Sequence, residues 1–122
     1  MAQHNDRGRW GESVAAAYLT AHGYAIRETN WRHHHYEIDI VAMKGDRVVI
    51  AEVKTRADRF MDPADAVTPA KQRRLVNAAN AYMHLSMLPH EVQFDIVVVT
   101  GTPNSYEIEH IPDAFYPKIK KY

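Results

Sequence analysis

The sequence predicts a single α/β domain, a mixed β-sheet flanked by helices, with its elements in the order α-β-β-β-α-β-β. Two segments have apolar residues at helical spacing, and five short runs have the length and residue types of strands. A chain of 122 residues is close to the commonest domain size. We therefore expect one domain over residues 1–122, with frayed ends at 1–8 and 117–122.

The helices are predicted from their apolar spacing and their end signals. An alanine-rich segment, 11–22, precedes Gly23, which suits the left-handed residue after a helix. Thr68 and Pro69 form a helix start, because threonine caps a helix and proline fits its first position. We expect that second helix to continue to about Leu85.

The predicted strands are 24–29, 36–43, 47–55, 92–100 and 106–111. The second and third flank a turn that contains Gly45, which predicts a β-hairpin. The fourth is so apolar that we place it at the centre of the sheet. We expect a polar connection at 30–35 and a mobile loop at 57–65.

Composition excludes several classes of protein. Hydrophobic residues make up 46% of the chain and charged residues 25%, which is typical of a globular domain. No apolar run approaches the roughly 18 residues that span a bilayer. The chain has no cysteine and its N-terminus has no apolar secretory segment, so we expect a cytoplasmic protein without a membrane partner. Fifteen basic and fifteen acidic residues cancel, so nucleic acid would have to be bound by local patches.

Charged residues at the ends of two apolar strands are the main functional signal. Glu52 and Lys54 are two apart on one strand and therefore share a face, while Val53 points to the other. If the hairpin forms, Asp39 on the preceding strand can approach Glu52 across the ladder. Two converging carboxylates repel each other, and a hard divalent cation with oxygen ligands would offset that repulsion.

A phosphodiester is the substrate that these groups suit best. Lys54 could stabilise negative charge on a phosphoryl transition state, and the cation could polarise the phosphoryl oxygen. Glu12, in the first turn of the opening helix, could lean over the same edge of the sheet. Each residue alone also has a simpler explanation: a solvated surface pair for Glu52 and Lys54, a surface acid for Asp39, and a favourable helix-dipole contact for Glu12. Their joint order favours the functional interpretation.

The ordered landmarks resemble the YraN-like family of bacterial proteins over almost the whole chain. They are Gly11-Glu12, Ala16, Tyr18-Leu19, Gly23-Tyr24, Asn30, Glu37-Ile38-Asp39, Glu52-Val53-Lys54, Arg56, Lys71, Ala78-Ala79, Phe94-Asp95 and Ala114-Phe115. That family is similar to Holliday-junction resolvases and to other nucleases of the PD-(D/E)xK superfamily. The resemblance implies a restriction-endonuclease-like mixed sheet.

The resemblance also implies the site. It assigns catalytic roles to Glu12, Asp39, Glu52 and Lys54, and it implies one or two Mg²⁺ (or Mn²⁺) ions. The three acids and the backbone carbonyl of Val53 would be the metal ligands. The chain departs from the family pattern at three positions, where Tyr36 replaces a glycine, Ile38 a proline and Gln93 an arginine.

Basic residues near the acidic strand are candidates for binding a phosphate backbone: Arg56, Lys71, Arg73 and Arg74. The sequence contains no base-reading motif, so we expect recognition of backbone and shape in DNA. The run His33-His34-His35 could capture a transition metal or, when protonated, add charge beside DNA.

Three hypotheses remain open from the sequence. The first is an Mg/Mn-dependent endonuclease for branched or structured DNA, which could act as a homodimer. The second is a nucleic-acid-binding module that keeps a nuclease fold without turnover. The third is a protein-interaction subunit that uses the apolar segment 82–88.

Overall fold

In the computed structural model, residues 2–58 and 67–117 are described, and side chains from residue 6 onward within these ranges. They form α1 (Ala2–Ala21), β1 (Ala25–His33), β2 (Tyr36–Lys44), β3 (Arg47–Arg56), α2 (Pro69–Ser86), β4 (Glu91–Thr102) and β5 (Ser105–Phe115). This order is α-β-β-β-α-β-β, as predicted. Thr68 caps α2 through its side chain, which accepts a hydrogen bond from the Lys71 backbone N–H, and Pro69 occupies the first turn.

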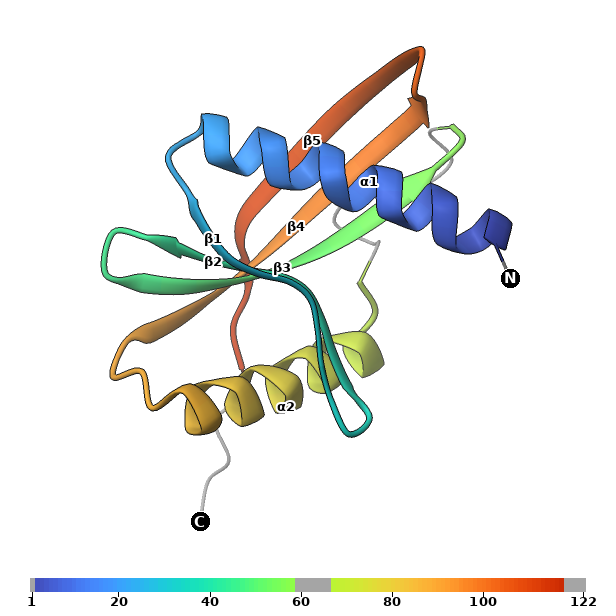
Figure 1. Cartoon of the computed structure of the whole chain (residues 1–122). Helices are drawn as coiled ribbons and strands as arrows, with labels where there is room; N and C mark the ends of the chain where they lie inside the picture. Colours follow the sequence, from blue (N-terminus) through green and yellow to red (C-terminus); the bar gives the residue numbers. More distant parts are fainter. Residues whose placement is uncertain (1, 59–66, 118–122) are drawn as a thin grey trace.

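The five strands make one mixed sheet in the spatial order β1-β2-β3-β4-β5. β1 with β2, β2 with β3, and β4 with β5 are antiparallel, whereas β3 and β4 are parallel from Arg47↔Glu91 to Arg56↔Thr100. In Figure 1, α1 crosses one face of the sheet and α2 lies on the opposite face. The predicted sheet flanked by helices is thus confirmed, and so is the predicted 36–55 hairpin.

Each face of the sheet has its own apolar core. Under α1, Leu19 packs with Ile40, Val49 and Val97, and under α2, Tyr82 packs with other side chains of the sheet. β4 is buried continuously from Phe94 to Thr100, as expected for a strand covered on both faces.

Asp95 is a buried charged residue on β4, with only 1% of its surface exposed. Its carboxylate accepts hydrogen bonds from the Tyr24 hydroxyl, the Gln93 amide and the Asp113 backbone N–H, and it contacts His110 Nε2 at 2.7 Å. Although burial alone would raise it, these partners hold the pKa of Asp95 below its usual value. The network fixes β5 to β4 beside the register shift between Phe94 and Ile96.

The elements are longer than the sequence pattern predicts. α1 begins at Ala2 rather than at residue 11, so residues 2–8 belong to a helix and not to a frayed end. Glu12 therefore lies in the middle of α1 and not in its first turn, and a helix-dipole contact does not explain it. β1 continues to His33 through most of the predicted connection 30–35, because Trp31 pairs with Ile38 and Arg32 with Glu37. Strand pairing here outweighs local polarity. Most of the predicted loop 57–65, and the tail beyond Pro117, lie outside the described residues.

The far end of the β1–β2 hairpin bends away from the sheet. β2 pairs with β3 only from Ile40↔Ala51 to Lys44↔Arg47, while its pairing with β1 continues to His33↔Tyr36. Figure 1 shows this end of the hairpin beside α2. As a result Ile38 packs in the core under α2 and Ile40 in the core under α1, although strict alternation would put both on one face.

None of the helices in the described part of the chain is long and apolar enough to cross a membrane. The interaction hypothesis requires the segment 82–88 to be exposed, but only part of it is. Tyr82 is buried in the core at 1% exposure, whereas Leu85 and Met87 are 53% and 86% exposed.

Candidate functional site

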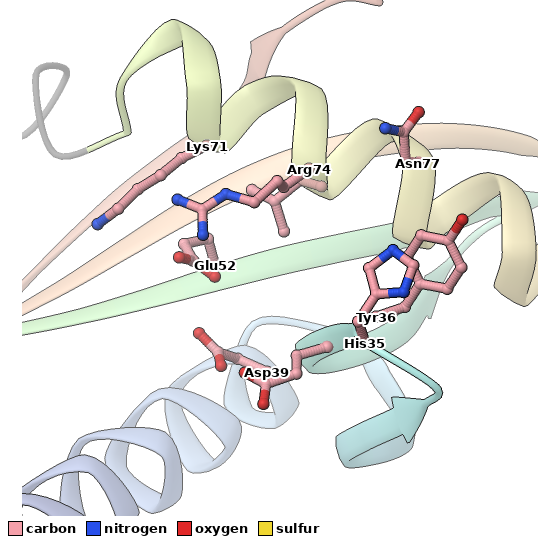
Figure 2. Close-up of a pocket in the computed structure, with 9 residues that line it drawn as sticks. His35, Tyr36, Asp39, Glu52, Lys71, Arg74 and Asn77 are labelled. Atoms are coloured by element: carbon pink, nitrogen blue, oxygen red, sulfur yellow. The ribbon is translucent and has the colours of Figure 1, made fainter.

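The site lies where β2 and β3 part. The last β2–β3 pair is Ile40↔Ala51, and the next residues along the two strands are Asp39 and Glu52. Beyond that point the backbone N–H of Val53 donates a hydrogen bond to the side chain of Asp39, with 2.8 Å between the nitrogen and Oδ2. Figure 2 shows Asp39 and Glu52 on opposite sides of the resulting gap, with both carboxyl groups turned toward it.

Glu52 is strongly affected by this position. Burial, the charge of Asp39 and a side-chain hydrogen bond with Asp39 together raise the pKa of Glu52 to about 8. The positive charges of Lys71 and Lys54 oppose the shift but do not cancel it. At neutral pH Glu52 therefore retains a proton that a bound cation would displace.

Glu12 reaches the same carboxylate from α1. Gly11, the preceding residue, lies so close to the Thr55 side chain that a Cβ atom would overlap its Cγ2. This close approach of helix and strand brings Glu12 to Asp39. Burial and the Asp39 charge raise the pKa of Glu12 to about 7, while a hydrogen bond with Asn30 acts in the opposite direction.

Two hollows flank this acidic cluster. The one on the α2 side, of about 230 Å³, is lined by His35, Tyr36, Glu37, Asp39, Glu52, Lys71, Arg74, Leu75 and Asn77. The one on the α1 side, of about 580 Å³, is lined by Gly8, Arg9, Glu12, Asn30, Trp31, Arg32, Glu37, Ile38 and Asp39. Asp39 and Glu37 line both, so Asp39 stands between them.

The predicted basic residues have different surroundings. Lys54 is exposed beside Glu52, and Lys71 and Arg74 line the α2-side hollow. Arg73 is exposed on α2 and does not line either hollow. Arg56 is engaged within the sheet, where its guanidinium donates to Thr100 Oγ1 at 2.9 Å and pairs with Glu109 at 3.3 Å.

The donor set fits a magnesium-type ion better than a transition metal. Among the described residues, no three His, Cys, Asp or Glu side chains are arranged to hold a metal ion. Mg²⁺ does not require three, because it binds through one or two carboxylates together with waters and substrate phosphate. Asp39 and Glu52 would supply the carboxylates. The carbonyl of Val53 leaves β3 on the same side as its N–H, toward the gap, and could join them.

The histidine run does not form a closed metal site. His33 stacks on Trp31 with ring centroids 6.0 Å apart, and His34 has a left-handed backbone with φ 56° at the hairpin turn. Only His35 of the three lines the α2-side hollow.

Sequence reasoning missed several lining residues, above all Tyr36 and Asn77. One signal for Asn77 was available: Lys71, Arg74 and Asn77 follow one another at intervals of three on α2 and therefore share a face. The sequence marks Tyr36 only as a departure from the family's glycine, and its place in the hollow results from the bend of the hairpin.

Fold and site together define a mixed α/β domain with a carboxylate cluster at the point where two central strands separate. Residues 11–99 match the family described as "Uncharacterised protein family UPF0102", and the chain belongs to that family. This confirms the predicted YraN-like relationship.

Relatives in several bacteria match nearly the full chain. A UPF0102 protein of Bacteroides fragilis is 50% identical over 120 residues, which cover 98% of this chain and 99% of the relative. One from Bacteroides thetaiotaomicron is 49% identical with the same coverage. One from Parabacteroides distasonis is 50% identical over 117 residues, 95% of this chain and 97% of the relative.

Proposed function

We propose that this protein is an endonuclease that uses Mg²⁺ or Mn²⁺ to hydrolyse phosphodiester bonds of DNA, with branched or otherwise structured DNA as its substrate. One observation carries the proposal: Asp39 and Glu52 converge at the gap between β2 and β3, and the pKa of Glu52 rises to about 8 through burial and its proximity to Asp39. Folding tolerates such a pair of acids more readily when a cation occupies the gap.

The residues around the gap have separate tasks in this proposal. Asp39, Glu52, the Val53 carbonyl and Glu12 would hold the ion. A bound divalent ion supplies Lewis-acid activation of the phosphate and of water. Lys54, exposed beside Glu52, places an ammonium group next to the phosphate and stabilises the charge that develops in the transition state.

Lys71 and Arg74 extend the positive charge along α2, so that a phosphate backbone can lie across the gap. Positive groups on that side balance the three acids locally, although the whole chain has a net charge of zero.

The test is a cleavage assay with linear, flapped and four-way DNA in the presence of Mg²⁺ or Mn²⁺. We expect the wild type to cut at least one structured substrate, and Glu52→Ala and Lys54→Ala to lose activity while remaining folded. Asp46→Ala, which removes an exposed acid from the β2–β3 turn, is the matched control and should cut like the wild type. Failure of the wild type to cut any of these substrates with either metal would refute catalysis.

Among the residues that the structure describes, no three metal-ligating side chains converge, and this favours one alternative, a nucleic-acid-binding module without turnover. Metal titration by calorimetry separates the two functions. Uptake of Mg²⁺ by the wild type that is lost in Asp39→Ala supports the nuclease. Salt-sensitive DNA binding without metal uptake supports the module.

A further inference from the structure

The α2-side hollow has an aromatic wall that the proposed chemistry does not use. His35 and Tyr36 lie at the bent end of the β1–β2 hairpin, and their ring centroids are 4.3 Å apart with planes inclined by 36°. Figure 2 shows both rings facing the hollow, across from α2. His35 is exposed and Tyr36 half-buried, so a planar ligand can reach them.

The opposite wall is polar and basic. Lys71, Arg74 and Asn77 line the hollow from one face of α2. In Figure 2, Arg74 extends toward Glu52, while Asn77 lies near the two rings. Cationic groups therefore stand at the acidic end of the hollow and an amide at the aromatic end.

We propose that this hollow holds one unpaired nucleotide of the DNA strand, next to the phosphate that lies at the Asp39–Glu52 gap. Its base stacks on His35 and Tyr36, the Asn77 amide faces the base edge, and Arg74 with Lys71 binds the phosphate. Amides pair with base edges and guanidinium groups with phosphates in the same way elsewhere. This inference rests on the proposed function and names its substrate: a strand that is unpaired or displaced beside the scissile bond.

The size of the hollow supports a single base. Its volume of about 230 Å³ equals that of roughly eight waters at about 30 Å³ each, which is enough for one planar group of nucleobase size. It lies below the range of about 300 to 1,000 Å³ that is typical of pockets for larger ligands. A base can stack on the two rings only when it is free of its neighbours in a duplex, as it is in an unpaired or displaced strand.

The test measures binding apart from cleavage, with wild-type protein and no added divalent metal. The probes are duplexes with a single bulged 2-aminopurine, matched duplexes with 2-aminopurine paired, and a nucleoside monophosphate. We expect the bulged probe to bind more tightly than the paired one and its fluorescence to be quenched on binding. Stacking of a base on an aromatic side chain raises affinity by about fivefold to a hundredfold. Tyr36→Leu should therefore lower the affinity for the bulged probe by a factor of this order and leave the affinity for the paired probe unchanged.

Matched variants distinguish stacking from simple loss of structure. Tyr36→Phe keeps the ring and should recover most of the affinity that Tyr36→Leu loses. Tyr116→Leu removes an exposed tyrosine that does not line the hollow and should bind like the wild type. Arg74→Ala should weaken binding, whereas Arg73→Ala, at the neighbouring exposed position, should change it much less. Thermal melts verify that each variant is folded.

Several results would overturn the inference. Equal affinity for bulged and paired probes would do so, as would a Tyr36→Leu variant that binds the bulged probe like the wild type. A nucleoside monophosphate that binds as tightly as the bulged DNA would refute the assignment to a strand. Cleavage without a preference for unpaired strands would refute this inference and leave the nuclease proposal standing. Quenching of the bulged probe without any cleavage would support this inference and refute the nuclease proposal.

Discussion

The Oδ2 atom of Asp39 accepts a hydrogen bond from the Val53 backbone N–H, 2.8 Å away, just past the last β2–β3 pair. A side chain here takes the place that a backbone carbonyl of β2 would hold in a longer ladder. It satisfies a polar group that the parting of the strands would leave without a partner. The same hydrogen bond fixes the Asp39 carboxylate near Glu52. The separation of β2 from β3 therefore both ends the ladder and creates the acidic site.

Asp39→Asn should lower the pKa of Glu52. The amide oxygen can still accept from Val53, but the negative charge that raises the pKa of Glu52 is gone. Because burial is the largest cause of the shift, the pKa should remain above its ordinary value of 4.5. Carboxyl carbon NMR titration measures the change, with Asp46→Asn as the control. An unaltered Glu52 titration would show that the two acids are not coupled.

The sequence was sufficient for most of the fold and for half of the site. Strand period alone puts Glu52 and Lys54 side by side, and the Gly45 turn predicts the hairpin that brings Asp39 across from Glu52. The bend of that hairpin was not predictable, because the distance over which β2 stays on β3 depends on packing against α2. Tyr36 was missed for this reason, whereas the helical spacing of Lys71, Arg74 and Asn77 was a signal for Asn77.

The burial of Asp95 could not be predicted from the sequence pattern either. Phe94 predicts a core strand, but nothing local distinguishes Asp95, which is buried, from an exposed strand acid. Its partners Tyr24, His110 and the Asp113 N–H come from distant parts of the chain. Only the folded sheet brings them together.

Stability in the absence of metal should fall as the pH rises from about 4.5 to about 8. The pKa of Glu12 rises to about 7 and that of Glu52 to about 8 in the folded chain, from 4.5. In this window the folded state binds more protons than the unfolded state, so raising the pH favours unfolding. Both carboxyls keep some solvent contact, so the loss should be on the order of 1 to 3 kcal/mol.

Urea unfolding at several pH values measures this dependence. Glu52→Gln cannot ionise and should flatten the decline, whereas Asp46→Asn should leave it unaltered. A wild type whose stability increases steadily across this window would contradict the predicted protonation of the two acids.

Mg²⁺ should stabilise the protein more at pH 8 than at pH 5. The ion competes with the protons that Glu52 and Glu12 retain at low pH, so its affinity rises as they are released. At a hundredfold excess over its dissociation constant, a bound ion adds about 2.7 kcal/mol, which corresponds to about 10 °C in Tm for a domain of this size. Differential scanning fluorimetry with Mg²⁺ and with matched NaCl measures the effect. Asp39→Ala should abolish it, and equal stabilisation at both pH values would count against a site formed by these acids.

Gly11→Ala should weaken both the fold and the site. The added methyl group would overlap Thr55 Cγ2, so α1 must shift or the threonine must rotate, at a cost of about 1 to 3 kcal/mol for overpacking. Any shift of α1 moves Glu12 away from Asp39, and the pKa of Glu12 should then fall toward its ordinary value. Gly8→Ala is the control, because its Cβ would meet no atom within 4 Å and alanine favours the helix. If the double variant Gly11→Ala, Thr55→Ser, which removes the clashing methyl group, recovers both the stability and the Glu12 titration, the close helix–strand contact is what positions this acid.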